Sequence, residues 1–259
     1  MTAAAVDATR GELLSPSQVN TFLSCPAKWY FRYALGLVEP PTGTLALGTA
    51  FHSVLAANFR QKIETKQDLP TQELEESFGE AFAIAAEDAE LREDEEPAAL
   101  IETGRALVRR YMADAAASIQ PQAVELPVEG VIAGVRVHGI VDLLDVAGRI
   151  VDFKTAARRP AGITPEYRLQ LTTYSMITPG ASGPCRLDTV TKTRTAELIQ
   201  QNCEIGPEER RYAETLYPMA QEAMRDGIYP PRRGSHLCSR RYCGYWRECE
   251  REFGGRVDE

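Results

Sequence analysis

The sequence lacks any run of eighteen apolar residues, so we expect no transmembrane helix and no membrane partner. Its first ten residues, Met1–Arg10, contain no apolar segment of the kind found in secretory signals. We therefore expect a flexible tail over residues 1–12 and a cytoplasmic protein. No internal repeat or low-complexity linker divides the 259 residues, and 44% of them are hydrophobic, which is enough for one large core.

Basic residues are fewer than acidic ones. The net charge of −8 argues against a protein that bulk positive charge holds on nucleic acid, but it allows a local basic groove beside an acidic metal site. The dense carboxylate run Glu73–Glu96 is typical of a solvated helix face. Arginines mixed with aromatic residues suit a single strand of nucleic acid, although ordinary surface charge and aromatic packing give the same pattern. The basic and aromatic candidates are Arg158, Arg159, Lys192, Arg194, Arg232, Arg233, Arg240 and Arg241, with Tyr242, Tyr245 and Trp246.

Hydrophobic spacing divides the chain into a helical first half and a second half with strands. Ser15, Pro16 and Gln18 form a helix start with a capping residue, a first-turn proline and a capping-box glutamine. We expect one α/β (α+β) domain over residues 13–253, with a helical part to about 120, a core to about 228, a cysteine-rich segment to 253 and a flexible tail over 254–259. The expected helices are Ser15–Ala34, Leu45–Thr65, Thr71–Leu91, Pro97–Ile119, Pro165–Ile177 and Pro207–Asp226, and the expected strands are Ala123–Glu129, Val135–Asp145, Arg149–Thr155 and Cys185–Thr193.

Two of these strands form a candidate hairpin. Val135–Asp145 and Arg149–Thr155 flank a three-residue loop that ends in Gly148, and such a loop favours glycine at its last position because the backbone there is left-handed. Counting back from this loop places Asp142 opposite Asp152. Opposed residues lie roughly 5 Å apart, and opposed like charges destabilise a sheet. The pair therefore needs a counter-charge.

A divalent cation would supply that counter-charge, and the residues around it would suit phosphodiester hydrolysis. Side chains alternate along a strand, so Lys154 shares a face with Asp152. Carboxylates bind Mg²⁺ or Mn²⁺ through oxygen, the metal activates a bound water, and a lysine can orient that water or neutralise developing charge. The alternative is an exposed hairpin with charged edges.

Gly139-x-x-Asp142 followed by Asp152-Phe153-Lys154-Thr155 resembles the PD-(D/E)XK nucleases, and within them the RecB-like branch. The resemblance implies a restriction-endonuclease-like core, in which helices flank a central mixed sheet. Three further motifs agree with that branch in the same order: Leu14-Ser15-Pro16-Ser17 through Phe22-x-x-Cys25-Pro26 as its first helix, Gly48-Thr49-Ala50-Phe51-His52 as its histidine motif, and Gln170-x-x-x-Tyr174 as the helix after the catalytic strand.

Carried over residue by residue, this resemblance assigns roles in the site. His52 alone would be read as a core histidine, and the resemblance makes it a metal ligand. Gln170 and Tyr174 lie one helical turn apart and would point toward Lys154 or the DNA strand. The implied ligands of Mg²⁺ or Mn²⁺ are His52, Asp142, Asp152 and the carbonyl of Phe153, and the implied catalytic residues are Asp142, Asp152, Lys154, Gln170 and Tyr174.

Three of the six cysteines close the chain as Cys238-x4-Cys243-x5-Cys249. In a reducing compartment they indicate zinc or an iron–sulfur cluster, either of which needs a fourth thiolate, and Cys25 is the best supplier. One early and three late cysteines are similar to the AddB and CRISPR-associated RecB-like nucleases, which implies a [4Fe–4S] cluster, although four residues separate Cys238 from Cys243 where those relatives have two. Small buried hydrophobes are the expected role of Cys185 and Cys203.

These patterns predict a metal-dependent deoxyribonuclease, an exonuclease or end-trimming enzyme that acts on DNA with a single-stranded end. One alternative is a catalytically silent DNA-binding or scaffold module, which would not need Asp142, Asp152 and Lys154. Another is a CRISPR prespacer-trimming nuclease that works with an integrase, and a phage or repair role fits equally. The chain has no GxxxxGK[ST] motif, so a helicase partner would be a separate chain.

Overall fold

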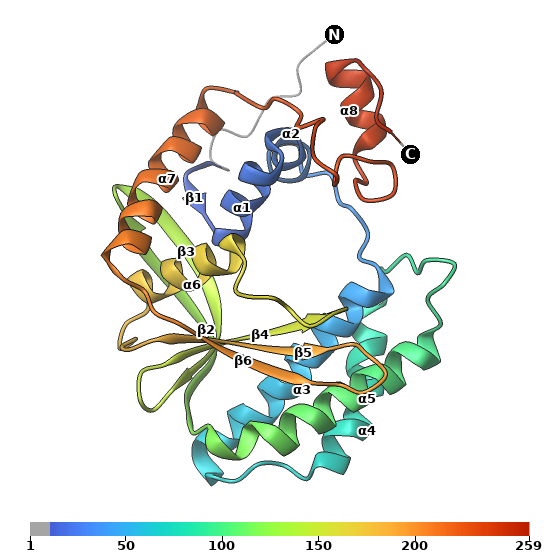
Figure 1. Cartoon of the computed structure of the whole chain (residues 1–259), viewed down its shortest axis with the longest axis vertical. Coiled ribbons are helices and arrows are strands. Elements are labelled where there is room, and N and C mark those ends of the chain that lie inside the picture. The colour runs from blue at the N-terminus through green and yellow to red at the C-terminus, as the bar shows by residue number, and fades with distance from the viewer. Residues whose placement is uncertain (1–10, 259) are drawn as a thin grey trace. The chain divides into compact units, whose positions relative to one another are not determined.

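A computed structural model describes residues 11–258, so the tail expected over 1–12 lies almost wholly outside the described residues. The fold is mixed α/β, with helices flanking a mixed sheet, as the sequence predicts (Figure 1). The described helices are α1 (Pro16–Ser24), α2 (Pro26–Trp29), the π-helix η2 (Tyr30–Ala34), α3 (Gly43–Thr65), α4 (Thr71–Ala85), α5 (Pro97–Asp114), the 3₁₀ helix η3 (Ala116–Ser118), α6 (Pro165–Ile177), α7 (Pro207–Arg225) and α8 (Trp246–Phe253). The described strands are β1 (Leu13–Leu14), β2 (Pro121–Ile132), β3 (Val135–Asp145), β4 (Ile150–Ala156), β5 (Cys185–Thr191) and β6 (Leu198–Cys203).

The sheet has the order β1-β3-β4-β5-β6, with β2 also paired to β3. Strand β3 runs antiparallel to β4, β4 runs parallel to β5, and β5 runs antiparallel to β6. Because β4 is hydrogen-bonded on both sides, its backbone is held rigidly. That strand carries the predicted catalytic sequence Asp152-Phe153-Lys154.

The chain forms two compact units that interleave along the sequence. We call them the terminal unit (Met1–Glu39, Glu129–Gly139 and Pro207–Glu259) and the central unit (Pro40–Val128 and Ile140–Gly206). Segments from both ends of the chain pack together in the terminal unit.

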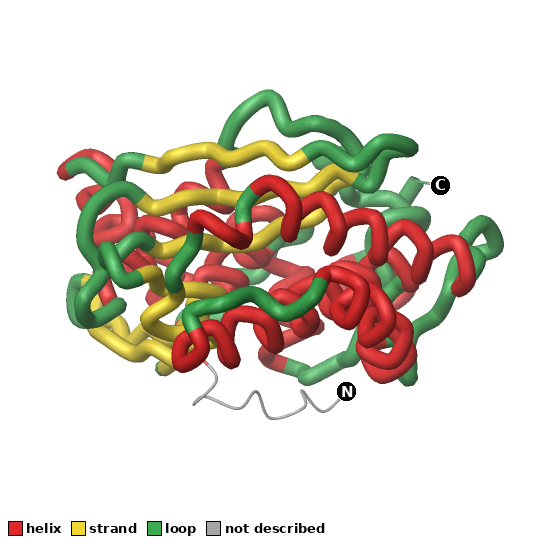
Figure 2. Tube along the Cα trace, turned by 90° about the horizontal axis from the view of Figure 1, so that it is seen from below, coloured by secondary structure: helices red, strands yellow, loops and turns green. Residues whose placement is uncertain are grey.

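The central unit is built around one hydrophobic core. Helices α3, α4 and α5 pack against one another, α3 also contacts β4, and α5 also contacts β5 and β6 (Figure 1). Figure 2 shows helices running alongside the strands. Val151 and Phe153 of β4 lie in this core, whereas the alternate residue Asp152 bonds to α6. The two faces of β4 therefore have opposite characters, one apolar and one polar.

The helix expected over Ser15–Ala34 is interrupted at Cys25, and this part of the prediction was wrong. Cys25 is extended (φ −160°, ψ 107°) because the following Pro26 disfavours helical geometry before it. The capped start was correct, since the Ser15 hydroxyl accepts a hydrogen bond from the Gln18 backbone N–H. The break ends α1 at Ser24 and leaves Cys25 at a corner between two helices.

The C-terminal tail expected over residues 254–259 is packed as far as Asp258. The Val257 side chain is 2% exposed, and its backbone N–H donates to Glu250. The Arg240 backbone N–H donates to the Asp258 carbonyl over 2.9 Å. Short hydrogen bonds with the cysteine-rich segment thus extend its structure beyond residue 253.

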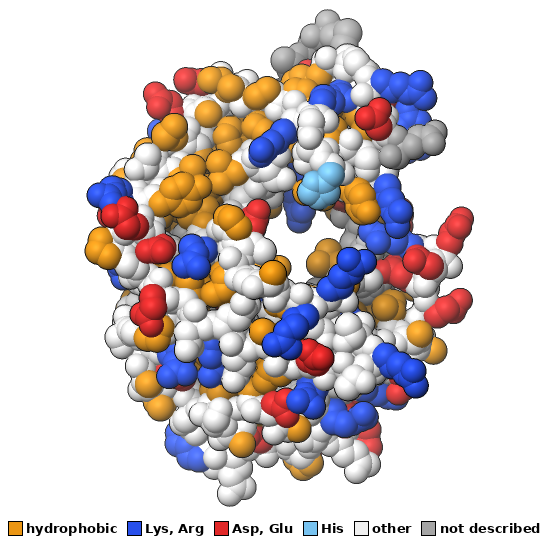
Figure 3. All heavy atoms as spheres, in the orientation of Figure 1, with side chains coloured by type: hydrophobic (Ala, Val, Ile, Leu, Met, Phe, Trp, Pro, Cys, Tyr) orange, Lys and Arg blue, Asp and Glu red, His pale blue; other side chains and the backbone are white. Residues whose placement is uncertain are grey.

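Charged side chains of both signs are interspersed on the face of the molecule drawn in Figure 3. In the acidic run, Glu73, Glu76 and Glu80 are exposed on α4, as predicted for a solvated helix face. Among the described residues, no helix combines the length and apolar character needed to cross a membrane.

Candidate active site and cysteine cavity

The β3–β4 hairpin has the predicted register. Gly148 adopts a positive φ of 77°, and its N–H donates to the Asp145 carbonyl over 2.9 Å. Leu143 pairs with Val151, and the same register places Asp142 opposite Asp152. The turn therefore positions the two carboxylates, because a shift by one residue would move them to opposite faces.

Asp152 lies in the interior, with 2% of its side chain exposed. Its Oδ1 accepts a hydrogen bond from Gln170 Nε2 over 3.1 Å, and its Oδ2 lies 2.5 Å from Lys154 Nζ. Burial and the nearby Asp142 carboxylate raise the pKa of Asp152 to about 6, although the Lys154 ammonium opposes that rise. The predicted pairing of Asp152 and Lys154 on one strand face is present.

Asp142 is bound from two directions. Its Oδ2 accepts a hydrogen bond from the Phe153 backbone N–H over 2.8 Å and lies 3.4 Å from His52 Nδ1. Burial alone would raise the pKa of Asp142, but His52, Lys154 and the Phe153 N–H bring it below the ordinary value. Burial likewise opposes protonation of His52, yet the Asp142 carboxylate raises the pKa of this imidazole.

One face of α6 covers the polar face of β4. Thr164 caps this helix and Pro165 is its first residue. Gln170 and Tyr174 lie one turn apart on it, and Gln170 Nε2 is 3.3 Å from the Tyr174 hydroxyl. The sequence reasoning missed Tyr167, whose ring centroid lies 5.2 Å from Lys154 Nζ. Its spacing, three residues before Gln170, was the available signal, because residues three apart on a helix share a face.

Phe153 anchors the strand from the opposite face. Its ring stacks on Phe59 of α3, with centroids 5.9 Å apart, and meets Tyr111 of α5 edge-on at 5.3 Å. The Tyr111 hydroxyl donates to the buried Asp188 carboxylate, which Arg186 also binds through two hydrogen bonds. This packing fixes the backbone on either side of Phe153, and therefore the origins of the Asp152 and Lys154 side chains.

The donor set suits a divalent cation in part. Asp152 Oδ2 is buried and has no hydrogen-bond partner of good geometry within residues 11–258, apart from its close ion pair with Lys154. Two carboxylates and the Phe153 carbonyl are the oxygen donors that Mg²⁺ or Mn²⁺ prefers. However, no three His, Cys, Asp or Glu side chains are gathered to hold a metal ion in this range. His52 Nδ1 lies 3.4 Å from Asp142 Oδ2, so this imidazole is close enough to be a further ligand of an ion held by that carboxylate.

The family model described as the PD-(D/E)XK nuclease superfamily matches residues 13–250. The chain belongs to the PD-(D/E)XK nuclease superfamily. This assignment confirms the broad resemblance seen in the sequence. Among curated proteins, none matches the sequence.

A solved structure shares the fold of this chain. A crystal structure of a candidate exonuclease from Eubacterium rectale is similar with a TM-score of 0.59 and 13% sequence identity, over 89% of each chain. The structure named SSO0001 is 14% identical over 88% of this chain and 90% of that one, with a TM-score of only 0.37.

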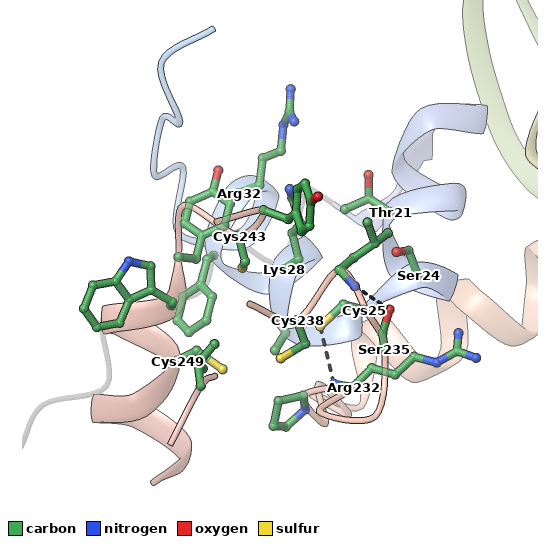
Figure 4. Close-up of a pocket in the computed structure, with 18 of the residues that line it drawn as sticks. Thr21, Ser24, Cys25, Lys28, Arg32, Arg232, Ser235, Cys238, Cys243 and Cys249 are labelled. Atoms are coloured by element: carbon green, nitrogen blue, oxygen red, sulfur yellow. Dashed lines mark hydrogen bonds between the residues drawn. The ribbon is translucent and has the colours of Figure 1, made fainter. Parts of the chain in front are cut away.

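The nuclease has a second candidate site in its terminal unit, where four cysteines line one cavity of about 340 Å³ (Figure 4). Cys25 comes from the corner between α1 and α2, Cys249 from α8, and Cys238 and Cys243 from the segment before α8. Ala27 and Phe31 pack with Tyr245 and Cys249, which joins the two ends of the chain. The structure thus brings the four predicted cysteines together around one space, although their thiols do not form a metal-holding group among the described residues.

The cavity disfavours isolated thiolates but contains hydrogen-bond donors and cations. Burial raises the pKa of Cys238 and of Cys243, and it raises that of Cys249 to about 11. The Arg232 backbone N–H lies 3.5 Å from Cys25 Sγ and donates to it. Lys28 also lines the cavity (Figure 4). A bound cation would lower the pKa of the thiols and favour their ionised form. The residues therefore fit a thiolate-bound metal or cluster.

The remaining sequence candidates are dispersed. Cys185 and Cys203 are buried and lie opposite each other on the paired strands β5 and β6, and neither lines the cysteine cavity. Arg158 and Arg159 are exposed just after β4, and Arg159 forms an ion pair with Glu197. Around Trp246, the guanidinium carbons of Arg240 and Arg247 lie 4.4 and 4.6 Å from the ring centroid, so these arginines pack on an aromatic ring.

Proposed function

We propose that this member of the superfamily is a metal-dependent DNA nuclease of the RecB-like branch. The observation that carries the proposal is the opposed pair Asp142 and Asp152 with Lys154 beside it on β4. The motif order supports the branch, and the match over residues 13–250 supports nuclease chemistry.

In the proposed reaction, Asp142, Asp152 and the Phe153 carbonyl would hold Mg²⁺ or Mn²⁺, with His52 as a further ligand. The ion, when bound, supplies an activated water and stabilises charge on the phosphate. Lys154 Nζ is placed to orient the attacking water or to neutralise charge that develops on the scissile phosphate. Gln170 Nε2 donates to Asp152 Oδ1 and Lys154 Nζ pairs with Oδ2, so these two residues position the carboxylate.

We propose an exonuclease or end-trimming activity on DNA with a single-stranded end. The histidine motif at His52 supports this choice, because the resemblance associates that motif with exonucleases. The exposed Arg158, directly after the catalytic strand, is placed to contact a phosphate of the substrate. A helicase on another chain would supply the DNA end, and an integrase on another chain would be the partner if the activity is prespacer trimming.

The four-cysteine cavity is proposed to hold a [4Fe–4S] cluster through Cys25, Cys238, Cys243 and Cys249. Its support is the convergence of the four residues on one cavity and the N–H donor at Cys25 Sγ. Iron–sulfur clusters favour thiolate ligands with such backbone donors, whereas four thiolates also accept zinc. The resemblance to the AddB and CRISPR-associated nucleases favours iron.

Digestion of end-labelled single- and double-stranded DNA with Mg²⁺ or Mn²⁺, after purification without oxygen, tests the nuclease proposal. Asp152→Ala and Lys154→Ala should lower turnover by at least 100-fold while DNA binding persists, since both remove groups used in the chemical step. Asp88→Ala, at an exposed carboxylate of the same unit, is the matched control. Wild-type rates in either active-site variant would refute the nuclease assignment and favour a silent DNA-binding module.

A further inference from the structure

The Lys154 ammonium has two neighbours on the polar face of β4. One is Asp152 Oδ2 at 2.5 Å, and the other is the aromatic ring of Tyr167, whose centroid lies 5.2 Å from Nζ. A cation within about 6 Å of a ring centroid is attracted by the negative face of the ring. Lys154 is therefore in contact with both a carboxylate and a π-system.

The local fold sets this arrangement. Thr164 caps α6 through its hydroxyl and Pro165 occupies the first turn, so the helix begins just before Tyr167. Tyr167 and Gln170 are three residues apart and share a helix face, while Asp152 and Lys154 are two residues apart and share a strand face. Gln170 contacts Asp152 and Tyr167 contacts Lys154, so two residues of α6 each contact one residue of β4.

We propose that Tyr167 is a positioning residue that holds the Lys154 ammonium beside Asp152 through its ring. A lysine side chain has four rotatable bonds and loses conformational freedom when it is held in one geometry. The half-buried ring removes part of that freedom before substrate binds, because it attracts the same ammonium that pairs with Asp152. The ring, and not the hydroxyl, carries this role.

This inference rests on the proposed function in one respect, since it takes Lys154 to be the lysine of the chemical step. Its direct test compares Tyr167→Phe, which keeps the ring, with Tyr167→Leu, which keeps an apolar side chain without a π-system. Tyr212→Leu, at an exposed tyrosine of α7, is the control for loss of a surface aromatic residue. Melting temperatures of all three variants establish that they are folded.

With saturating Mn²⁺, Tyr167→Leu should lower kcat about 2- to 30-fold with little change in KM, as expected for loss of a cation–π contact that positions a reacting group. Tyr167→Phe should keep the kcat of the wild type. Two results would overturn the proposal: an equal loss in the Phe variant, which would assign the role to the hydroxyl, or a rise in KM alone, which would assign the ring to base stacking.

A second readout does not depend on catalysis. Acylation of lysines by an amine-reactive ester, followed by mass spectrometry, reports how tightly each amine is held. Lys154 should react several-fold faster in Tyr167→Leu than in the wild type or Tyr167→Phe, while the exposed Lys66 reacts equally in all. Unchanged labelling of Lys154 would overturn the inference. If the wild type cleaves no DNA, the proposed function fails, and this labelling still decides the role of Tyr167.

Discussion

Lys154 Nζ lies 2.5 Å from Asp152 Oδ2, although both residues belong to one strand and are only two positions apart. Side chains at such positions point in the same direction, so the lysine must bend back along β4 to reach the carboxylate. Opposite them on β3, Asp142 binds His52 and the Phe153 N–H. The carboxylate of Asp142 thus faces His52 and that of Asp152 faces Lys154, so each has a nitrogen group within ion-pair distance.

The first prediction concerns His52. Its replacement by alanine should raise the Mn²⁺ concentration for half-maximal activity by about 10- to 100-fold, the range typical of weakened metal sites. Activity should partly return at high Mn²⁺, and a titration of initial cleavage rates against Mn²⁺ measures the change. His236→Ala, at an exposed position, should leave the titration unchanged. A variant that melts early but keeps the normal Mn²⁺ titration would make His52 a structural residue.

The second prediction follows from the raised pKa of Asp152, about 6, which burial and Asp142 produce. A metal ion binds the ionised carboxylate, so protons compete with it below pH 6. In metal-free protein the folded pKa exceeds the unfolded value of 3.8, so this group stabilises the fold fully below pH 3.8 and loses that contribution as the pH rises through 6.

The increase in melting temperature on adding Mn²⁺ should therefore be small at pH 5 and grow until about pH 7. Differential scanning fluorimetry with and without Mn²⁺ across this range measures it. Asp152→Asn, which removes the titrating group, should abolish both the increase and its pH dependence. An increase that is equal at pH 5 and pH 7.5 would show that Asp152 is not a metal ligand.

The sequence predicted the hairpin because its information is local. Gly148 gives the turn, the turn gives the register, and the register places Asp142 opposite Asp152. The same reasoning located α6 from Pro165 to Ile177, with Gln170 and Tyr174 on one face. Motif order gave the superfamily, which the match over residues 13–250 confirms.

Contacts between distant segments could not be read in this way. Strand β6 (Leu198–Cys203) was missed because it is short and half polar, and it becomes a strand through its pairing with β5. The π-helix at Tyr30–Ala34 follows the break at Cys25, and no sequence period marks it. The contact between His52 and Asp142 depends on charges that neighbouring elements bring together, so hydrophobic periodicity does not predict it.

The third prediction concerns the contact between α4 and α5. A Cβ at Gly104 would overlap the ring of Phe78, which is fully buried, so Gly104→Ala should destabilise the protein by about 1–3 kcal/mol. Gly79→Ala is the matched control on α4, because its Cβ would meet only the end of the Arg105 side chain. This change should stabilise the helix by about 0.5–1 kcal/mol. Urea unfolding midpoints measure the stability of both variants. Equal shifts of the midpoint in Gly104→Ala and Gly79→Ala would contradict the close packing of Gly104 on Phe78.

The fourth prediction concerns the cysteine cavity. Protein purified without oxygen should be brown, with about four irons and four sulfides per chain if it holds a [4Fe–4S] cluster. Cys25→Ser should remove the colour, as should serine at Cys238, Cys243 or Cys249. Cys203→Ser should keep it, because Cys203 lies in β6 and takes no part in the cavity.

Loss of the cluster should also lower stability. The cluster would link Cys25 to Cys238 and so enclose a loop of more than two hundred residues. Closing a loop of that length removes unfolded-state entropy worth up to about 5 kcal/mol. Cys25→Ser should therefore melt well below Cys203→Ser when both are compared under anaerobic conditions. A colourless protein with one tightly bound zinc would refute the iron–sulfur cluster but keep the link between the two ends of the chain. A metal-free protein whose melting temperature is unchanged by Cys25→Ser would refute both.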